Sequence, residues 1–201
     1  MSPKSSTGSS HRERLLSAGR NSIYDHGYNG SSVDSILQTA SVPKGSFYHH
    51  FGSKEAFGFA VMERYLDQQG LLLASWVDRD DLPVPQRLGG YHSELVQRFE
   101  DSGRQWACLM GKLSNEVSAS NDSFRERLRC SFLTWQSRLA DLLTQGQQSG
   151  EVTRDLSASS LGSIVLVMLQ GGFVSALTLG EDAHLPAVTD AIVDLLTAAT
   201  P

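Results

Sequence analysis

The residues best suited to chemistry lie together in one short stretch, KGSFYHHF, which runs from Lys44 to Phe51. Phe47 and Phe51 are four residues apart, so they would share the buried face of a two-turn helix. Lysine, serine, tyrosine and histidine side chains then occupy the exposed surface, and these residue types bind DNA phosphates and base edges. Gly45 and the small Ser46 leave room for the helix backbone to approach the bases. The stretch therefore predicts a recognition helix for the DNA major groove.

The residues just before this stretch predict a second short helix. Its apolar positions, three and four residues apart, are Val33, Ile36, Leu37 and Ala40. Ser31 or Ser32 can cap its start, and Pro43 has the backbone angle favoured at the first position of the next helix. Two short helices joined by a tight turn form a helix-turn-helix. An ordinary packed helical hairpin would show the same periodicity and stays open as the alternative on these grounds alone.

A third helix completes this unit on its N-terminal side. Ser10 can cap a helix over His11–His26, whose Leu15, Leu16 and Ile23 would pack on the other two helices. Gly27 and Gly30 bound a turn in which both glycines can take a positive φ. We expect residues 10–53 to form a helix-turn-helix DNA-binding domain. Residues 1–9 are rich in serine and glycine and predict a disordered tail, with a minor-groove arm as the less favoured reading.

The stretch 32–55 closely resembles the DNA-binding segment of the tetracycline-repressor (TetR/AcrR) family. The matching positions are Ser32, Val33, Ile36, Val42, Lys44, Gly45, Ser46, Phe47, Tyr48, His50, Phe51, Ser53, Lys54 and Glu55. Ser41 departs from a frequent glycine, and Pro43 from a frequent serine or threonine whose hydroxyl could contact a phosphate. The resemblance implies a homodimer on a pseudo-palindromic DNA operator, controlled by a small-molecule effector. The candidate DNA-binding residues are Ser32, Lys44, Gly45, Ser46, Tyr48, His49, His50 and Lys54.

The charge distribution fits DNA binding by one end of the chain. The 201 residues carry a net charge of −5, which by itself argues against nucleic-acid binding. Residues 1–60, however, hold six Lys and Arg against four Asp and Glu, whereas residues 61–201 hold eleven against eighteen. A mildly basic head on an acidic body is the expected result. No run of apolar residues is long enough to span a membrane and no signal peptide is visible, so we expect a cytoplasmic protein that binds no membrane.

The remaining chain predicts further helices and hence an all-α fold, in which a helical ligand-binding and dimerisation domain at residues 54–201 follows the three-helix head. The expected helices are Lys54–Asp78, Gln86–Asp101, Arg104–Ser118, residues 122–148, Leu156–Leu179 and Pro186–Ala199. The penultimate helix is apolar nearly all round, and the last carries Leu185, Val188 and Ile192 on one face. We interpret both as the dimerisation surface, with the closed core of a monomer as the alternative.

The body also contains a candidate ligand pocket. Its expected residues are Trp76, Trp106, Cys108, Met110 and Trp135. The segment WACLMGKLSNE resembles a subgroup of the family with the approximate pattern Gly-Cys-Leu-x-Gly-Asn-Leu-x-x-Glu, some members of which respond to electrophiles or small unsaturated acids. Cys108 occupies the cysteine of that pattern, while Ala107 and Lys112 depart from it. A nearby helix start and Arg104 would favour a reactive thiolate at Cys108, whereas a cysteine among such apolar neighbours is usually an inert packed side chain.

These features predict a ligand-responsive dimeric transcriptional regulator, most readily a repressor that its effector releases from the operator. A helix-turn-helix architectural or interaction protein without an effector is the alternative. Nothing in the sequence supports an enzyme, since no triad pattern occurs and His49 and His50 are adjacent on a helix and point in different directions. The spacing of Cys108 and Cys130 fits no zinc site. We therefore expect no metal and no cofactor.

Overall fold

The computed structural model describes residues 10–198, so the predicted tail at residues 1–9 lies outside the described part of the chain. The helices are α1 (His11–Gly30), α2 (Val33–Ala40), α3 (Lys44–Phe51), α4 (Lys54–Val77), α5 (Val84–Asp101), α6 (Leu109–Val117), α7 (Asp122–Ser149), α8 (Ala158–Leu179) and α9 (Leu185–Leu196). One isolated antiparallel bridge joins Val152 to Thr197, and residues 10–198 contain no named strand. The predicted all-α fold is confirmed.

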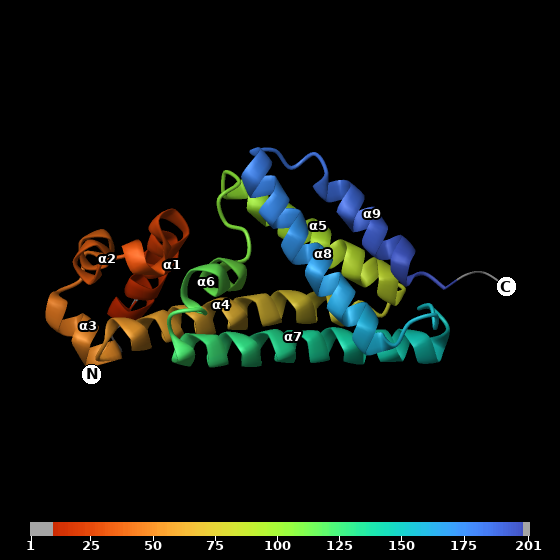
Figure 1. Ribbon diagram of the computed structural model, residues 1–201, viewed down its shortest axis with the longest axis horizontal. Coiled ribbons are helices and arrows are strands. Elements are labelled where there is room, and N and C mark those ends of the chain that lie inside the picture. The colour runs from red at the N-terminus through yellow and green to blue at the C-terminus, as the bar shows by residue number, and fades with distance from the viewer. Residues whose placement is uncertain (1–9, 199–201) are drawn as a thin grey trace, which may run out of the picture.

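Helices α1, α2 and α3 form a head at one end of an elongated molecule (Figure 1). The long helices α4 and α7 run side by side along its length, and α5, α8 and α9 pack together at the other end. Helix α6 lies between the head and that far end, where it contacts both α1 and α7. A displacement of α4 or α6 would therefore reach the head directly.

Serine hydroxyls cap the starts of α1, α2 and α4, whereas α3 follows Pro43 and has no side-chain cap. The hydroxyl of Ser10 accepts the Glu13 N–H at 3.3 Å, and the hydroxyls of Ser32 and Ser53 accept the N–H groups three residues on at 3.0 Å each. Such caps each contribute about 1 kcal/mol to helix stability. The inward side chains bury almost completely, among them Leu15, Leu16, Ile23, Ile36, Phe47 and Phe57.

Two backbone positions give the head its shape. Ser41 ends α2 with φ of 52°, which lets the chain turn sharply into α3. Gly27 breaks α1 with φ of 75°, close to the predicted end at His26, and a single turn of helix follows before Ser31. The expectation of a positive φ at Gly30 is wrong, because that residue lies within this extra turn and only Gly27 provides the break.

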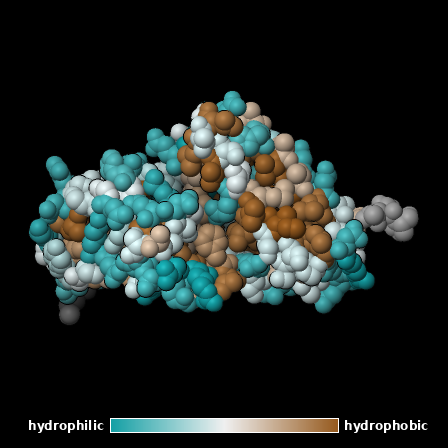
Figure 2. Space-filling model, in the orientation of Figure 1, coloured by the Kyte–Doolittle hydropathy of each residue, from teal (hydrophilic) through white to brown (hydrophobic). Residues whose placement is uncertain are grey.

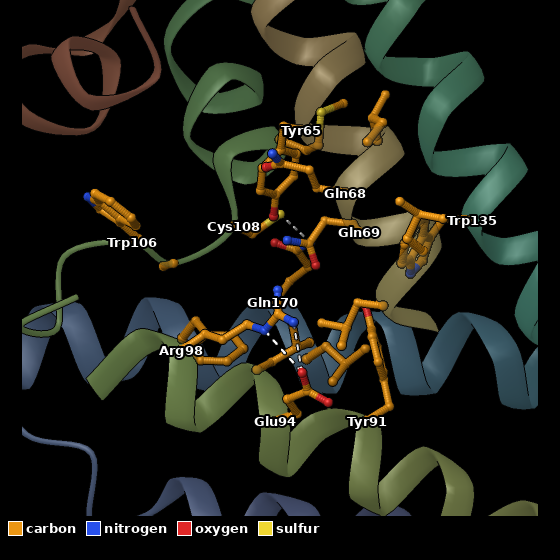
Figure 3. A pocket seen from close by; sticks show the side chains of 18 of the residues that line it. Tyr65, Gln68, Gln69, Tyr91, Glu94, Arg98, Trp106, Cys108, Trp135 and Gln170 are labelled. Carbon is orange, nitrogen blue, oxygen red and sulfur yellow. Dashed lines mark hydrogen bonds and ion pairs between the residues drawn. The ribbon is translucent and has the colours of Figure 1, made fainter. Parts of the chain in front are cut away.

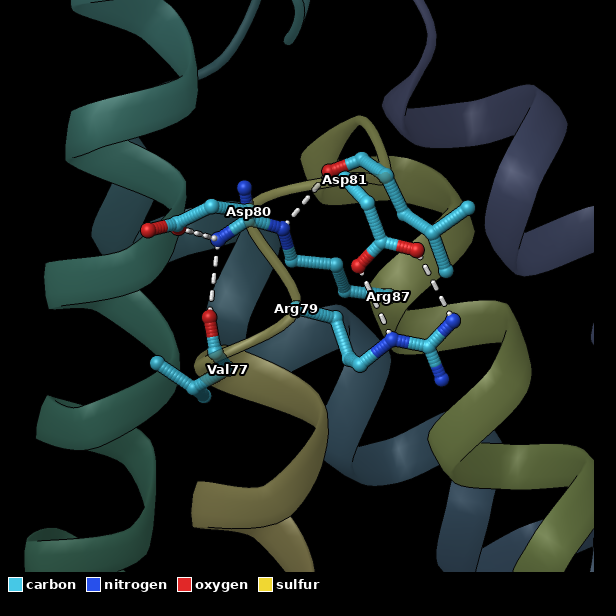
Figure 4. A network of polar contacts seen from close by, with 6 residues as sticks. Val77, Arg79, Asp80, Asp81 and Arg87 are labelled. Atoms are coloured by element: carbon cyan, nitrogen blue, oxygen red, sulfur yellow. Dashed lines mark hydrogen bonds and ion pairs between the residues drawn. The ribbon is translucent and has the colours of Figure 1, made fainter.

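The connection between α4 and α5 is held by buried hydrogen bonds rather than by its prolines alone. The Arg87 guanidinium donates to the carbonyl oxygens of Val77 and Leu82, at 2.7 Å in both cases, and pairs with Asp80 at 3.1 Å (Figure 4). Helix α5 begins at Val84, two residues earlier than predicted. Pro85 is accommodated in its first turn, where the missing N–H has no helical partner to lose.

The predicted helix Arg104–Ser118 is wrong in its first five residues. Arg104 has φ of 62° and forms an ion pair with Asp182 at 2.6 Å, so the chain turns away from a helical path. The hydroxyl of Ser102 accepts the N–H of Trp106 at 3.0 Å. Helix α6 therefore begins only at Leu109, with Cys108 as its N-cap. This non-helical segment becomes part of the wall of a cavity.

By length and composition alone helix α8 could cross a membrane, a test that core helices of soluble proteins also pass. Within the protomer one side of it packs on α7 and α9. Its other side exposes Val167 and Val174, with 69% and 54% of their surface accessible. Figure 2 shows hydrophobic side chains gathered over this helix.

Helix α9 differs from the prediction in where its apolar side chains go. Leu185, Ile192 and Leu196 are buried inside the protomer, against α5 and α8. They are therefore not the free surface that the sequence suggested. The helix ends at Leu196, and Ala199, its predicted end, lies outside the described residues.

Candidate DNA-binding head and ligand cavity

Helix α3 presents a nearly unobstructed surface to solvent. A β-carbon built on Gly45 would have no neighbouring atom within 4 Å, so this position is open on the outer side of the helix. Lys44, Tyr48, His49 and His50 are exposed around it, while Phe47 holds the opposite face in the core. The geometry leaves space for another surface to come close to the helix backbone at Gly45.

Three of the predicted DNA-binding side chains already have partners within the head. Lys44 Nζ lies 3.0 Å from Asp34 Oδ1, and this hydrogen bond raises the pKa of the lysine. The Ser46 hydroxyl lies 3.2 Å from His11 Nδ1, and that of Ser32 caps α2. An exposed ion pair such as Lys44–Asp34 contributes little to stability, so exchanging it for a phosphate costs little.

Lys54 lies at the start of α4 and is more enclosed than a surface lysine. Its Nζ donates to the Asn29 carbonyl at 3.3 Å and stands 4.8 Å from the centre of the Tyr28 ring. Burial lowers the pKa of Lys54 from its ordinary value. The side chain therefore ties α4 to the end of α1, at the edge of the surface that carries α3.

A cavity of about 920 Å³ opens among the helices of the body. Four of the five predicted pocket residues line it, namely Trp106, Cys108, Met110 and Trp135. The fifth, Trp76, does not. Its ring packs on Gly90, where a β-carbon would come within 2.1 Å of it, and its Nε1 donates to Glu94 at 2.7 Å. Trp76 therefore supports the wall from behind.

Two donors surround the sulfur of Cys108. The Gly111 N–H lies 3.4 Å from Sγ, and the Gln170 side-chain amide donates to Sγ at 3.0 Å (Figure 3). A β-carbon at Gly111 would lie 2.8 Å from Gln170 Oε1, so the glycine makes room for this approach. Arg104, expected to assist Cys108, points elsewhere and binds Asp182. N–H donors at a helix start are the arrangement that stabilises negative charge on sulfur.

Several lining residues were missed by the sequence analysis. They are Arg20, Tyr24, Tyr65, Gln68, Gln69, Tyr91, Glu94, Arg98 and Gln170. The sequence could have pointed to Gln170, since it is a lone amide in the middle of the most apolar helix. Burial raises the pKa of Tyr65 well above its ordinary value, so its hydroxyl remains a neutral hydrogen-bonding group. Arg20 and Tyr24 had no such signal, because they belong to α1 and not to the body.

The head and the cavity wall are joined by two sets of hydrogen bonds. The Tyr24 hydroxyl on α1 donates to the Ala107 carbonyl at 2.8 Å. Glu116 on α6 accepts the backbone N–H groups of Tyr28 and Asn29, each at 2.7 Å. A β-carbon at Gly27 would lie 2.7 Å from Glu116 Oε2, so only glycine fits there. Both ends of the segment 107–116 are thereby attached to α1.

The chain matches known protein families and individual relatives over most of its length. Residues 15–61 match the family described as bacterial regulatory proteins, tetR family, and residues 84–192 match the tetracyclin repressor-like C-terminal domain. The HTH-type transcriptional repressor DhaR of Mycobacterium sp. (strain GP1) is 32% identical over 163 residues, which cover 81% of this chain and 80% of DhaR.

Two solved structures extend the similarity to nearly the whole chain. The regulatory protein TetR from Rhodobacter sphaeroides has a TM-score of 0.87 and 30% identity, over 93% of this chain and 99% of the other. The reduced form of NemR from E. coli has a TM-score of 0.86 and 26% identity, over 95% and 99% of the two chains.

Proposed function

The chain belongs to the TetR family of bacterial transcriptional regulators, and we propose that it is a dimeric repressor that a small-molecule effector releases from operator DNA. Regulators of this family bind operators as dimers and take effectors in the C-terminal domain. The alternative of an architectural protein without an effector is not favoured, since a cavity of about 920 Å³ is within the usual size range of ligand sites.

The observation that carries the proposal is the shared wall of the cavity. Arg20 and Tyr24 of the head line the same space as Cys108 and Trp135 of the body. An effector would therefore contact both the DNA-binding head and the helices behind it. We propose that its contacts differ between the DNA-competent and DNA-incompetent arrangements, which is the thermodynamic requirement for switching.

We propose that α3 enters the major groove with Gly45 closest to the bases. Lys44, Ser46, Tyr48, His49 and His50 would surround that contact, and Ser32 and Lys54 would anchor phosphates at its margins. The support is the open space around Gly45 and the exposure of the four larger side chains. Lys44 would exchange Asp34 for DNA, and Lys54 would reach a phosphate from its place beside Asn29.

Further assignments concern the domains, the class of protein and its location. We divide the chain into a DNA-binding domain at residues 10–53 and a ligand-binding and dimerisation domain at 54–201, with the exposed apolar side of α8 as the centre of the dimer interface. This class of protein is not enzymatic. We place the protein in the cytoplasm, where an operator is accessible to it.

Cys108 is the proposed sensor for electrophiles. Its thiol would lose a proton, and the sulfur would bond to the β-carbon of an unsaturated carbonyl compound while the carbon–carbon π pair moves to the α-carbon, which takes up a proton. The relative NemR was solved in a form described as reduced. Met110 and the rings of Trp106 and Trp135 would enclose the bound molecule.

Operator release tests the proposed function. An operator selected from random DNA would be titrated with the full chain by fluorescence anisotropy, before and after treatment with an uncharged quinone. We expect cooperative binding of a dimer and loss of affinity after treatment, which disappears in Cys108→Ser but persists in Cys130→Ser, since Cys130 is exposed and lies outside the cavity. Failure to select any operator would contradict the repressor function, whereas an unchanged response in Cys108→Ser would remove only the sensor.

A further inference from the structure

One cationic side chain of the cavity wall lacks a compensating negative charge. The Arg20 guanidinium carbon stands 4.4 Å from the centre of the Trp106 ring. Its hydrogen-bond contacts within the described residues 10–198 are two long ones to its neighbour Asn21, both at 3.4 Å. No carboxylate of that part of the chain lies within 4.0 Å of it. Burial and the nearby charge of Arg64 lower the pKa of Arg20.

The other charged residues of the wall are already satisfied. Arg98 pairs with Glu94 at 2.7 Å, and Figure 3 shows this pair lying together in the cavity wall. Asp101 is exposed and accepts a hydrogen bond from Gln97 at 3.0 Å. Arg20 is thus the charged group of the wall for which a ligand of opposite charge would supply a missing ion-pair partner.

The surroundings of Arg20 suit a planar anion. Tyr24, one turn further along α1, stacks on Trp106 with ring centres 5.9 Å apart and an angle of 17° between the planes. A guanidinium matches a carboxylate with two parallel hydrogen bonds, and a partly enclosed site strengthens such a pair. The rest of the wall offers apolar contact to a hydrocarbon tail, from Leu72, Leu95, Leu166, Leu169, Phe173 and Trp135.

We propose that the cavity binds a small organic acid whose carboxylate is received by Arg20, beside the Trp106 ring, with its hydrocarbon part extending toward Trp135. The carboxylate would join α1 to the segment 104–108, because the arginine that receives it belongs to the head and stacks on the Trp106 ring of that segment. That this acid acts as an effector rests on the proposed function, whereas its binding to Arg20 does not.

Matched acids and amides test the charge requirement. Isothermal titration calorimetry on the full chain would compare hexanoate with hexanamide, benzoate with benzamide, and 3-phenylpropanoate with 3-phenylpropanamide, which differ in charge and little in shape. We expect at least one acid to bind about tenfold more tightly than its amide, as a charge-assisted hydrogen bond provides. Arg20→Gln should remove this preference and leave amide binding unchanged, and Arg20→Lys should retain part of it.

Arg127→Gln is the matched control. Arg127 also stands over an aromatic ring, 4.3 Å from the centre of Phe59, but it lies on α7 outside the cavity, and its loss changes the net charge equally. The acid preference should survive in this variant. Equal binding of all acids and amides by the parent, or an acid preference that persists in Arg20→Gln, would overturn the proposal. Release of the operator by an uncharged quinone in Arg20→Gln would still support the proposed function, so the two failures are distinguishable.

Discussion

Gly45 is the residue on which the assignment of α3 to the major groove depends most. Because its outer side is open, a leucine can be built there without a clash inside the protein. Leucine also favours a helix over glycine by about 0.8 kcal/mol. We expect Gly45→Leu to keep or raise the melting temperature and to weaken operator binding about a hundredfold or more, since a bulky side chain separates the helix from the bases.

Gly45→Ala is the graded control, since its methyl group fills much less of the groove and should cost less affinity. Both variants would be measured by anisotropy with one selected operator and by thermal melting. Unchanged operator affinity of a folded Gly45→Leu protein would remove α3 from the groove.

The hydrogen bond from Gln170 to Cys108 provides a second test at the residue scale. Gln170→Leu has a similar volume but cannot donate to Sγ, so a negative sulfur loses one of its two N–H donors. We expect alkylation of Cys108 by iodoacetamide to slow about tenfold in a Cys130→Ser background, as followed by mass spectrometry. An equal or faster rate would show that Gln170 only packs against the thiol.

At the scale of elements, the attachment of α6 to α1 is the feature that sequence reasoning did not find. The pattern that drew attention to Cys108 also contains Gly111 and Glu116, and the structure gives both a function: Gly111 admits Gln170, and Glu116 binds the end of α1. Spacing along the chain identified the motif. It could not show that Glu116 accepts from main-chain N–H groups nearly ninety residues earlier. Almost every residue carries such a group, so the sequence does not identify which ones Glu116 binds.

The helices themselves were largely predictable because local signals decide them. Apolar spacing, with Ser32 before α2 and Pro43 before α3, predicts these two helices as observed, whereas the start of α6 was missed. There, contacts between residues far apart in sequence hold the segment outside a helical path, among them the hydrogen bond of Tyr24 to the Ala107 carbonyl and the ion pair of Arg104 with Asp182. A contact that the sequence does not reveal also explains why Trp76 was wrongly predicted to line the cavity. Its aromatic character suggested a pocket residue, but its ring packs against Gly90.

Glu116 allows the coupling between cavity and head to be tested. Glu116→Gln keeps the size of the side chain but offers one oxygen in place of two for the N–H groups of Tyr28 and Asn29. We expect the ratio of operator affinities without and with effector to fall several-fold, which corresponds to roughly 1 kcal/mol of coupling. Binding of the effector itself, measured by calorimetry, should change much less.

Glu55→Gln is the matched control for this variant. Glu55 also joins the head side of α4 to the body, through Asn121 at 2.8 Å, but among residues 10–198 it accepts no hydrogen bond from the end of α1. Its replacement should leave the affinity ratio intact. Equal loss in both variants would indicate general loosening rather than transmission through Glu116.

At the scale of the whole molecule, the free apolar side of α8 is the proposed dimer interface. Val174 is 54% exposed on that side, so Val174→Asp places a charge in the proposed interface without disturbing the protomer core. We expect the variant to sediment as a monomer and to lose operator affinity while its circular dichroism stays helical. Leu133→Asp is the control, because Leu133 is 49% exposed but lies on α7 and does not line the cavity. A dimeric Val174→Asp protein would contradict this interface.

The central claim is that a ligand in the cavity and operator DNA on the head oppose each other's binding, and reciprocal titration tests it most directly. Operator affinity would be measured with and without a saturating reversible ligand found by calorimetry, and the affinity for that ligand with and without saturating operator. Linkage requires both affinities to fall by the same factor, which we expect to be about tenfold or more. A ligand that fills the cavity and leaves operator affinity unchanged would contradict the account.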